Sequence, residues 1–169
     1  KEHPDSLVSL MYGNNEIGNL NPITEIGQLC RQYGALFHSD TVQAIGHYPI
    51  DLQQLPVDFI VGSAHKFHGP KGVGFLYIRG ETNIPPYIHG GAQERNMRGG
   101  TENVAGIVGL AKALELAHLE MKEHQAHVLA LKQRLIEKLR NEIEDLDFNG
   151  RSAEVDQSLY TVISVSLPA

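Results

Sequence analysis

The stretch SAHKFHGPKG, residues 63–72, places a single lysine between an apolar run and a glycine-rich turn. Residues 58–62 read DFIVG and are typical of a buried strand, so Lys66 is expected just beyond the end of a sheet element. A free lysine amine is protonated at neutral pH, and only the neutral amine attacks an aldehyde. Lys66 is therefore a candidate nucleophile if its surroundings are apolar, although most lysines are solvated loop residues.

A second polar residue follows another apolar run upstream. Residues 35–37 are apolar, and Asp40 comes just after them in the stretch FHSDTVQ, residues 37–43. The carboxyl ends of parallel strands meet at one edge of a sheet, where ligands bind in α/β proteins, so Asp40 and Lys66 are predicted to meet around one ligand. If that ligand is pyridoxal phosphate, the carboxylate keeps the ring nitrogen protonated and the lysine holds the aldehyde as an imine. Taken alone, Asp40 is more typical of a helix cap or turn.

Four sequence blocks together carry a family resemblance. They are MYGNNEIG at residues 11–18, HSDTVQ at 38–43, SAHK with GPKG at 63–66 and 69–72, and HGGAQERNMRGGTEN at 89–103. In this order and approximate spacing, the chain resembles the pyridoxal-phosphate-dependent cysteine desulfurases, which belong to the class-V aminotransferases of fold type I. The resemblance covers nearly the whole chain, and residues 95–103 of the last block favour the desulfurases over other fold-type I enzymes.

The resemblance implies roles for the residues around the cofactor. It implies that Lys66 holds the cofactor aldehyde and that Asp40 pairs with the pyridine nitrogen. Gln43 resembles the donor to the phenolic oxygen, and Asn15 resembles an asparagine near that oxygen and the substrate carboxylate. Amide donors suit such oxygens. Without the resemblance, Asn15 reads as a turn residue.

The resemblance also implies contacts to the cofactor phosphate. Ser63 and His65 resemble the phosphate ligands, and His65 is in addition a candidate proton shuttle. Thr101 matches a threonine that reaches the phosphate bound by the neighbouring subunit, so a homodimer is implied. Considered alone, Ser63 and Thr101 are equally well explained as caps of turns or helices.

The implied activity is that of a cysteine desulfurase. Such an enzyme takes sulfur from L-cysteine, releases L-alanine and leaves an enzyme persulfide for iron–sulfur cluster assembly or other sulfur transfer, with a scaffold or sulfur-acceptor protein as partner. The freed Lys66 would remove the substrate α-proton. The alternatives are a related fold-type I enzyme, such as a selenocysteine lyase or an aminotransferase, a catalytically silent homologue that binds a scaffold protein, and a plain structural domain.

By comparison with that family, the chain is expected to be a central fragment that is inactive alone. The segment with a phosphate-binding glycine-threonine turn and a stacking histidine, the persulfide cysteine and the arginine for the substrate carboxylate all lie outside it. The single cysteine, Cys30, follows a helical pattern and is interpreted as a small buried hydrophobic residue.

Composition narrows the possible partners. A net charge of -6 argues against nucleic-acid binding through a basic surface. No apolar run approaches the roughly 20 residues of a membrane span, and residues 1–6 lack the apolar core of a signal peptide. The lone cysteine favours a reducing compartment, and we expect the cytoplasm. A P-loop pattern is absent. His124 and His127 have no evident third ligand, so no metal site is expected.

The expected elements alternate between strands and helices, which indicates an α/β layered domain. Strands are predicted at residues 6–11, 35–38, 59–63, 74–78 and 160–166. A helix capped by Asn21 should run to residue 32 and stop near Gly34, a helical turn should span 41–46, and a long helix should begin near Thr101. The resemblance implies part of a fold-type I, aspartate aminotransferase-like large domain with a mostly parallel sheet over residues 1–120. A connecting helix and the start of a small α+β domain are expected over 121–169.

Overall fold

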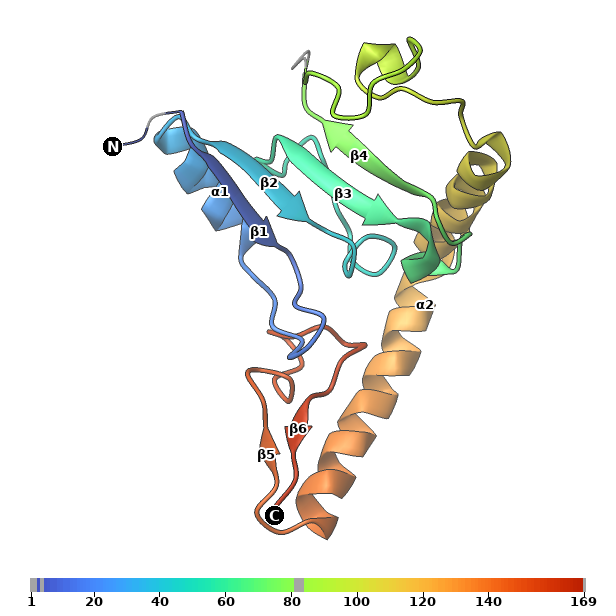
Figure 1. Ribbon diagram of the computed structural model, residues 1–169. Helices are drawn as coiled ribbons and strands as arrows, with labels where there is room; N and C mark the ends of the chain where they lie inside the picture. Colours follow the sequence, from blue (N-terminus) through green and yellow to red (C-terminus); the bar gives the residue numbers. More distant parts are fainter. Residues whose placement is uncertain (1–2, 4, 81–83, 169) are drawn as a thin grey trace.

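A mixed four-stranded sheet forms the centre of the computed structural model, which describes residues 3, 5–80 and 84–168 (Figure 1). The strands lie in the order β1 (Leu7–Met11), β2 (Leu36–Asp40), β3 (Phe59–Ser63) and β4 (Gly74–Ile78). The first three strands are parallel, and β4 pairs antiparallel with β3. The predicted mostly parallel sheet is therefore confirmed, with strand bounds within two residues of those expected.

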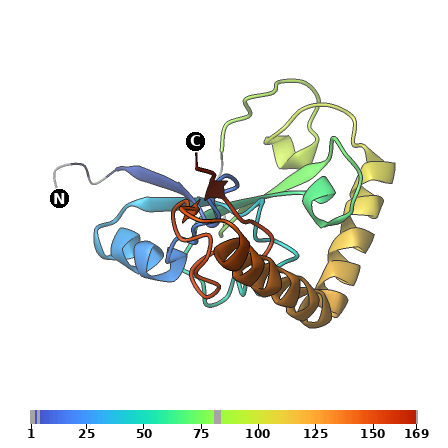
Figure 2. The same ribbon diagram turned by 90° about the horizontal axis from the view of Figure 1, so that it is seen from below.

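Helix α1 (Ile23–Gln32) joins β1 to β2 and covers one face of the sheet (Figure 2). Position 27 of this helix is a glycine because an added Cβ would lie 2.2 Å from the carbonyl oxygen of Pro56, so no larger residue fits. The helix ends where Gly34 adopts a left-handed φ of 71°. The Gly34 N–H bonds the Arg31 carbonyl and the Ala35 N–H bonds the Cys30 carbonyl, a Schellman motif that confirms the predicted stop.

The predicted helix cap at Asn21 is wrong. The residue before α1 is Pro22, and the Asn21 amide instead donates to the Met11 carbonyl at 2.7 Å. This bond joins the start of the helix to the end of β1. The Asn21 side chain therefore makes a contact between two elements instead of capping the helix.

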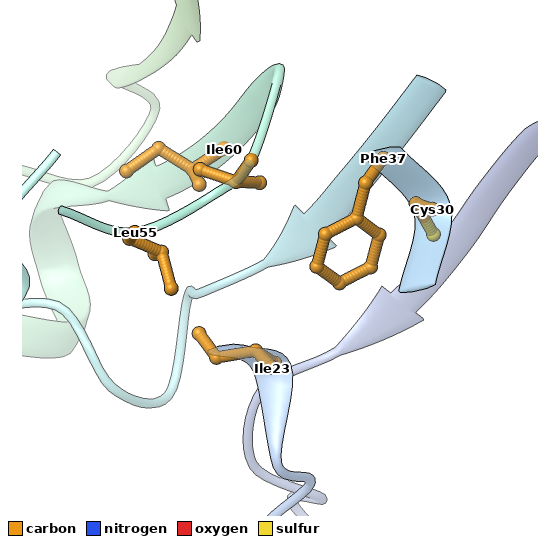
Figure 3. Close-up of a cluster of buried hydrophobic side chains, with 6 residues drawn as sticks. Ile23, Cys30, Phe37, Leu55 and Ile60 are labelled. Atoms are coloured by element: carbon orange, nitrogen blue, oxygen red, sulfur yellow. The ribbon is translucent and has the colours of Figure 1, made fainter. Parts of the chain in front are cut away.

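The hydrophobic core lies between α1 and the sheet (Figure 3). Phe37 of β2 and Ile60 of β3 are 0% and 1% exposed, and both point to the α1 side. Cys30 reaches them from the helix and is 6% exposed, which confirms its interpretation as a buried hydrophobic residue. Full burial of one such aliphatic or aromatic side chain contributes about 1.5–3 kcal/mol.

Helix α2 (Val104–Glu142) is a single helix of 39 residues that runs from the β4 side of the sheet to a small hairpin (Figure 1). Asn103 caps its start, because Oδ1 accepts a bond from the Gly106 N–H at 3.1 Å. The hairpin pairs β5 (Asp147–Phe148) with β6 (Val165–Ser166). Only the last part of the strand predicted at 160–166 is therefore a strand.

Residues 150–162, the C-terminal segment, form turns that pack against α2 instead. The buried Lys132 of α2 donates to the Ser158 hydroxyl at 2.8 Å and to the Leu159 carbonyl at 2.7 Å. Burial lowers the pKa of Lys132 to about 8. On its other side the segment bonds the loop after β1, where the Leu159 N–H donates to the Gly18 carbonyl at 2.7 Å.

Neither a membrane span nor a metal cluster is found in the part of the chain that the structure describes. None of the helices there combines the length and apolar character needed to cross a bilayer. The histidine, cysteine and acidic side chains there form no group of metal-ligating size either. His118, His124 and His127 on α2 are all exposed.

Candidate functional site

The carboxyl ends of β1, β2 and β3 meet at one edge of the sheet, and most of the predicted site residues lie there. Asp40 ends β2 and pairs in register with Val61, while Ser63 ends β3 two residues further on. Since side chains alternate along a strand and Ile60 points to α1, Asp40 and Ser63 lie on the opposite face. The sheet thus brings Asp40 and Ser63 to the same edge and the same face, and the turn that carries Lys66 begins directly after Ser63.

Lys66 lies in the turn that directly follows β3. The 3-10 helix η1 (Ala64–Phe67) begins after Ser63, and we call residues 63–69 the lysine turn. Ala64 and Phe67 are 0% and 1% exposed, so the backbone on both sides of the partly exposed Lys66 is anchored in the protein. The Gly69 N–H closes the turn by donating to the Ala64 carbonyl at 2.8 Å. Lys66 is therefore a partly exposed side chain on an anchored backbone.

Ser63 and His65 contact each other beside this lysine. The Ser63 hydroxyl lies 2.8 Å from His65 Nδ1. When the hydroxyl donates to Nδ1, the proton on Nε2 remains available to an oxyanion outside the protein. His65 is exposed and Ser63 partly exposed, so this pair can face an anionic group at the edge of the sheet.

Asp40 is held in a turn of its own. Its Oδ1 accepts a hydrogen bond from the Val42 N–H at 2.9 Å, and the Thr41 hydroxyl donates to the Val61 carbonyl at 2.7 Å. These bonds fix the chain where β2 ends. Among the described contacts Oδ2 has no hydrogen bond, so one oxygen of this carboxylate is available for a cationic partner. Gln43 follows in the turn 42–47 and is partly exposed.

Asn15 and Thr101 occupy more exposed positions. Asn15 lies in the loop after β1 and donates to the Glu16 carboxylate at 2.6 Å. Thr101 lies between the 3-10 helix η2 (Glu94–Asn96) and α2, and shares a cavity of about 260 Å³ with residues 72–74 of the turn after Lys66. Residues 94–96 have successive φ angles of 46°, 55° and 65°, which non-glycine residues rarely adopt.

Two residues that the sequence analysis did not single out, His47 and Tyr160, are linked by hydrogen bonds to the backbone of the lysine turn. His47 Nε2 is 2.9 Å from the Lys66 carbonyl oxygen, and His47 Nδ1 is 2.9 Å from the Tyr160 hydroxyl. Burial and the neighbouring Tyr48 raise the pKa of Tyr160 to about 12, so its hydroxyl keeps the proton. His47 falls just outside the HSDTVQ block, and nothing in its local sequence indicates a partner more than a hundred residues away.

Comparisons with known proteins agree on one family. The family described as "Aminotransferase class-V" matches residues 2–168. The cysteine desulfurase IscS of Dictyoglomus turgidum is 50% identical over 144 residues, which are 85% of this chain and 36% of that relative. The chain thus spans little more than a third of the length of the curated relatives it matches.

Solved structures give the same result. A structure described as a NifS-like protein is 43% identical, with a TM-score of 0.89 over 97% of this chain and 44% of that one. A structure of SspA in complex with cysteine is 33% identical, with a TM-score of 0.75 over 96% of this chain and 44% of that one. These matches confirm the fold-type I expectation.

Proposed function

This chain belongs to the class-V aminotransferase family, and from that membership we propose that the complete protein is a cysteine desulfurase that uses pyridoxal phosphate. The observation that carries the proposal is that Asp40 and Ser63 end neighbouring parallel strands at one edge and on one face of the sheet, with Lys66 in the turn directly after Ser63. The substrate is L-cysteine, in line with the desulfurase relatives and with the SspA structure that contains cysteine.

The side chains at this edge fit the cofactor chemically. Pyridoxal phosphate presents an aldehyde, a ring nitrogen and a phosphate, and the edge offers an amine, a carboxylate and a hydroxyl–imidazole pair. Lys66 would hold the aldehyde, Asp40 the protonated ring nitrogen, and Ser63 with His65 the phosphate. Gln43 and Asn15 would donate to the phenolic oxygen. When bound, the cofactor supplies an electron sink for charge that develops at the substrate α-carbon.

The protein's own residues would bind the cofactor and move protons. The free amine of Lys66 takes the α-proton of the substrate at Nζ, and the buried neighbours Ala64 and Phe67 keep the lysine backbone still while it does so. The Asp40 carboxylate favours the protonated ring nitrogen through its negative charge. His65 is placed to pass a proton at Nε2 as well as to bind phosphate.

The remaining expectations extend this proposal to the complete protein. Cys30 is buried in the α1 core, so a cysteine elsewhere must receive the sulfur. Thr101 is exposed, as a residue that serves a neighbouring subunit would be, and we include a homodimer in the proposal. We also include a large domain over residues 1–120 with a small domain starting in 121–169, a cytoplasmic location, and an iron–sulfur scaffold or another sulfur acceptor as partner.

The test uses the complete protein. Purified protein should take up pyridoxal phosphate with a visible absorption band. After borohydride reduction, mass spectrometry should find the cofactor on Lys66, and L-cysteine should yield equal amounts of L-alanine and protein-bound sulfur. A protein without the band would be a silent homologue. A protein with the band that acts only on selenocysteine, or that transfers the amino group, would be one of the related enzymes.

A further inference from the structure

The bridge that His47 makes has a defined direction. A carbonyl oxygen only accepts hydrogen bonds, so Nε2 of His47 carries the proton and donates to Lys66. In the neutral ring Nδ1 is then an acceptor, and it accepts a hydrogen bond from the Tyr160 hydroxyl. The imidazole thus connects the C-terminal segment to the backbone of the lysine turn.

The groups around the ring favour the neutral form that this bridge requires. Burial lowers the pKa of His47; the bond to the Lys66 carbonyl acts in the opposite direction, and the imidazoles of His124 and His68 lower the pKa further. Glu120 of α2 is the acidic residue that lines the same cavity of about 280 Å³. It does not reverse the net direction of the shift.

Tyr160 is a fixed end of the bridge. Its backbone N–H donates to the Tyr48 hydroxyl at 3.0 Å, and the two rings lie 5.4 Å apart. The residues before it are held to α2 by Lys132 and to the loop after β1 by the Gly18 carbonyl. The hydroxyl therefore stands at a point set by three separate parts of the chain.

The carbonyl that His47 holds restrains the backbone from which the lysine side chain projects. The Lys66 carbonyl and the Phe67 N–H belong to one planar peptide unit, so fixing the carbonyl fixes that plane. Phe67 secures the other side of the plane, because its side chain is buried against Gly46, where an added Cβ would lie 2.8 Å from the Phe67 Cβ. One hydrogen bond and one packed ring together hold the backbone from which Lys66 projects.

We propose that His47 is a positioning residue for Lys66, which transmits the placement of the C-terminal segment through Tyr160 to the amine that binds the cofactor. This role deepens the proposed function and rests on it, since it matters for the reaction only if Lys66 is the cofactor lysine. The link itself needs no cofactor, because every group in it belongs to the chain.

The test compares four variants of the complete protein. His47→Leu removes both bonds, His47→Gln keeps an N–H donor for the Lys66 carbonyl, and Tyr160→Phe removes only the distal bond. His127→Leu is the matched control: it removes an exposed imidazole from the same helix, and among the described residues His127 makes no hydrogen bond or ring contact with His47, Tyr160 or the lysine turn. All four are checked for wild-type unfolding midpoints before they are compared.

The first readout is hydrogen–deuterium exchange of the cofactor-free protein. The amides of His68 and Gly69, which both bond the Ala64 carbonyl, should exchange about five- to tenfold faster in His47→Leu, as expected for one lost hydrogen bond. His47→Gln should restore most of the protection, Tyr160→Phe should give an intermediate rate, and His127→Leu should match the wild type. Equal rates in His47→Leu and wild type would overturn the proposal, as would a His127→Leu variant that behaves like His47→Leu.

The second readout separates this proposal from the proposed function. With cofactor bound, His47→Leu should lower kcat about tenfold at unchanged KM for L-cysteine, since the amine is misplaced by one lost bond while substrate binding is not. If the wild type carries the cofactor on a lysine other than Lys66, the proposed function fails and the positioning role fails with it. If the cofactor is on Lys66 but exchange and kcat ignore His47, only the positioning role fails.

Discussion

The two faces of the central sheet differ in what their side chains do. On the α1 face, Phe37 and Ile60 are 0% and 1% exposed and pack against the helix. On the opposite face, Leu36, the residue of β2 just before Phe37, is 46% exposed. Asp40 and Ser63 lie on this face at the ends of their strands. Because the side-chain period of a strand is two, one stretch of five residues serves both faces.

Within the same strands, the side chains on one face stabilise the fold, and those on the other face include the residues that we propose to bind the cofactor. Side chains under α1 contribute burial and leave no room for a ligand, while those at the edge of the other face are held by backbone that the buried face fixes. A change on one face should therefore affect folding, and a change on the other should affect binding and catalysis. Each prediction below tests that separation in the complete protein.

The largest effect is expected for Lys66→Ala. In the proposed function this change removes both the group that would hold the cofactor and the group that would accept the α-proton, so desulfurase activity should fall by about 10⁴-fold or more. Because Lys66 is partly exposed and its neighbours supply the packing, the unfolding midpoint should stay close to that of the wild type. The measurements are alanine production from L-cysteine and thermal unfolding. A variant that keeps its covalently bound cofactor would remove Lys66 from the role.

A large effect on stability, with no direct effect on cofactor binding, is expected for Phe37→Ala. Removing a fully buried aromatic ring should cost about 3–5 kcal/mol of unfolding free energy, which urea denaturation measures. Phe37→Leu, which keeps most of the volume, is the matched control and should cost only about 1–2 kcal/mol. Molecules of Phe37→Ala that remain folded should bind cofactor normally. If folded Phe37→Ala had lost its cofactor absorption, the two faces would not act separately.

The third effect belongs to Asp40→Asn. The substitution keeps an oxygen that can accept from the Val42 N–H and removes only the negative charge. We expect kcat to fall by about 10²-fold, the order seen when one electrostatic contact to the reacting system is lost, with an unfolding free energy within about 0.5 kcal/mol of the wild type. The absorption spectrum of the bound cofactor should shift. An unchanged spectrum and rate would show that Asp40 does not face the ring nitrogen.

Local sequence predicted what depends on local rules and missed what depends on distant contacts. The strand at 59–63, the stop at Gly34 and the turn with Lys66 follow from hydrophobic runs and glycines, and the structure has them. The Asn21 cap fails because Met11, ten residues earlier, takes the amide. The link from His47 to Tyr160 joins residues 113 positions apart, a pairing that only the folded chain creates.

The candidate site follows the same division. That Asp40 and the turn with Lys66 follow the carboxyl ends of neighbouring strands was predictable because parallel strands share this edge, while their meeting around one ligand stays a prediction. The contacts that fix the lysine backbone could not be predicted from the sequence. His47 comes from the loop between β2 and β3, and Tyr160 lies beyond the whole length of α2. Short motifs mark the residues that we propose to react, and no such motif marks the residues that we propose to hold them in place.

The smallest effect concerns Lys132, which is buried but lies on neither face of the sheet. Its pKa is lowered to about 8, whereas an unfolded lysine titrates near 10.4, so between these values the unfolded state binds more protons than the folded state. Stability should therefore rise with pH in this window, by about 1 kcal/mol from about pH 7.5 to about pH 9. In Lys132→Met the rise should be absent.

The stability change should be measured near the lower end of this pH window. At higher pH other titrating groups lower the stability and oppose the effect of Lys132. Burial raises the pKa of the Cys30 thiol and of Tyr12, Tyr48 and Tyr160, and a group whose folded pKa is raised loses stability as the pH rises past its unfolded value. Urea midpoints of wild type and Lys132→Met at about pH 7.5, 8.3 and 9 isolate the lysine, since the other groups are common to both proteins. Parallel curves for the two proteins would mean that Lys132 keeps its charge at no cost when it binds Ser158 and Leu159. The C-terminal segment would then be held to α2 by a fully compensated cation rather than by one that burial disfavours.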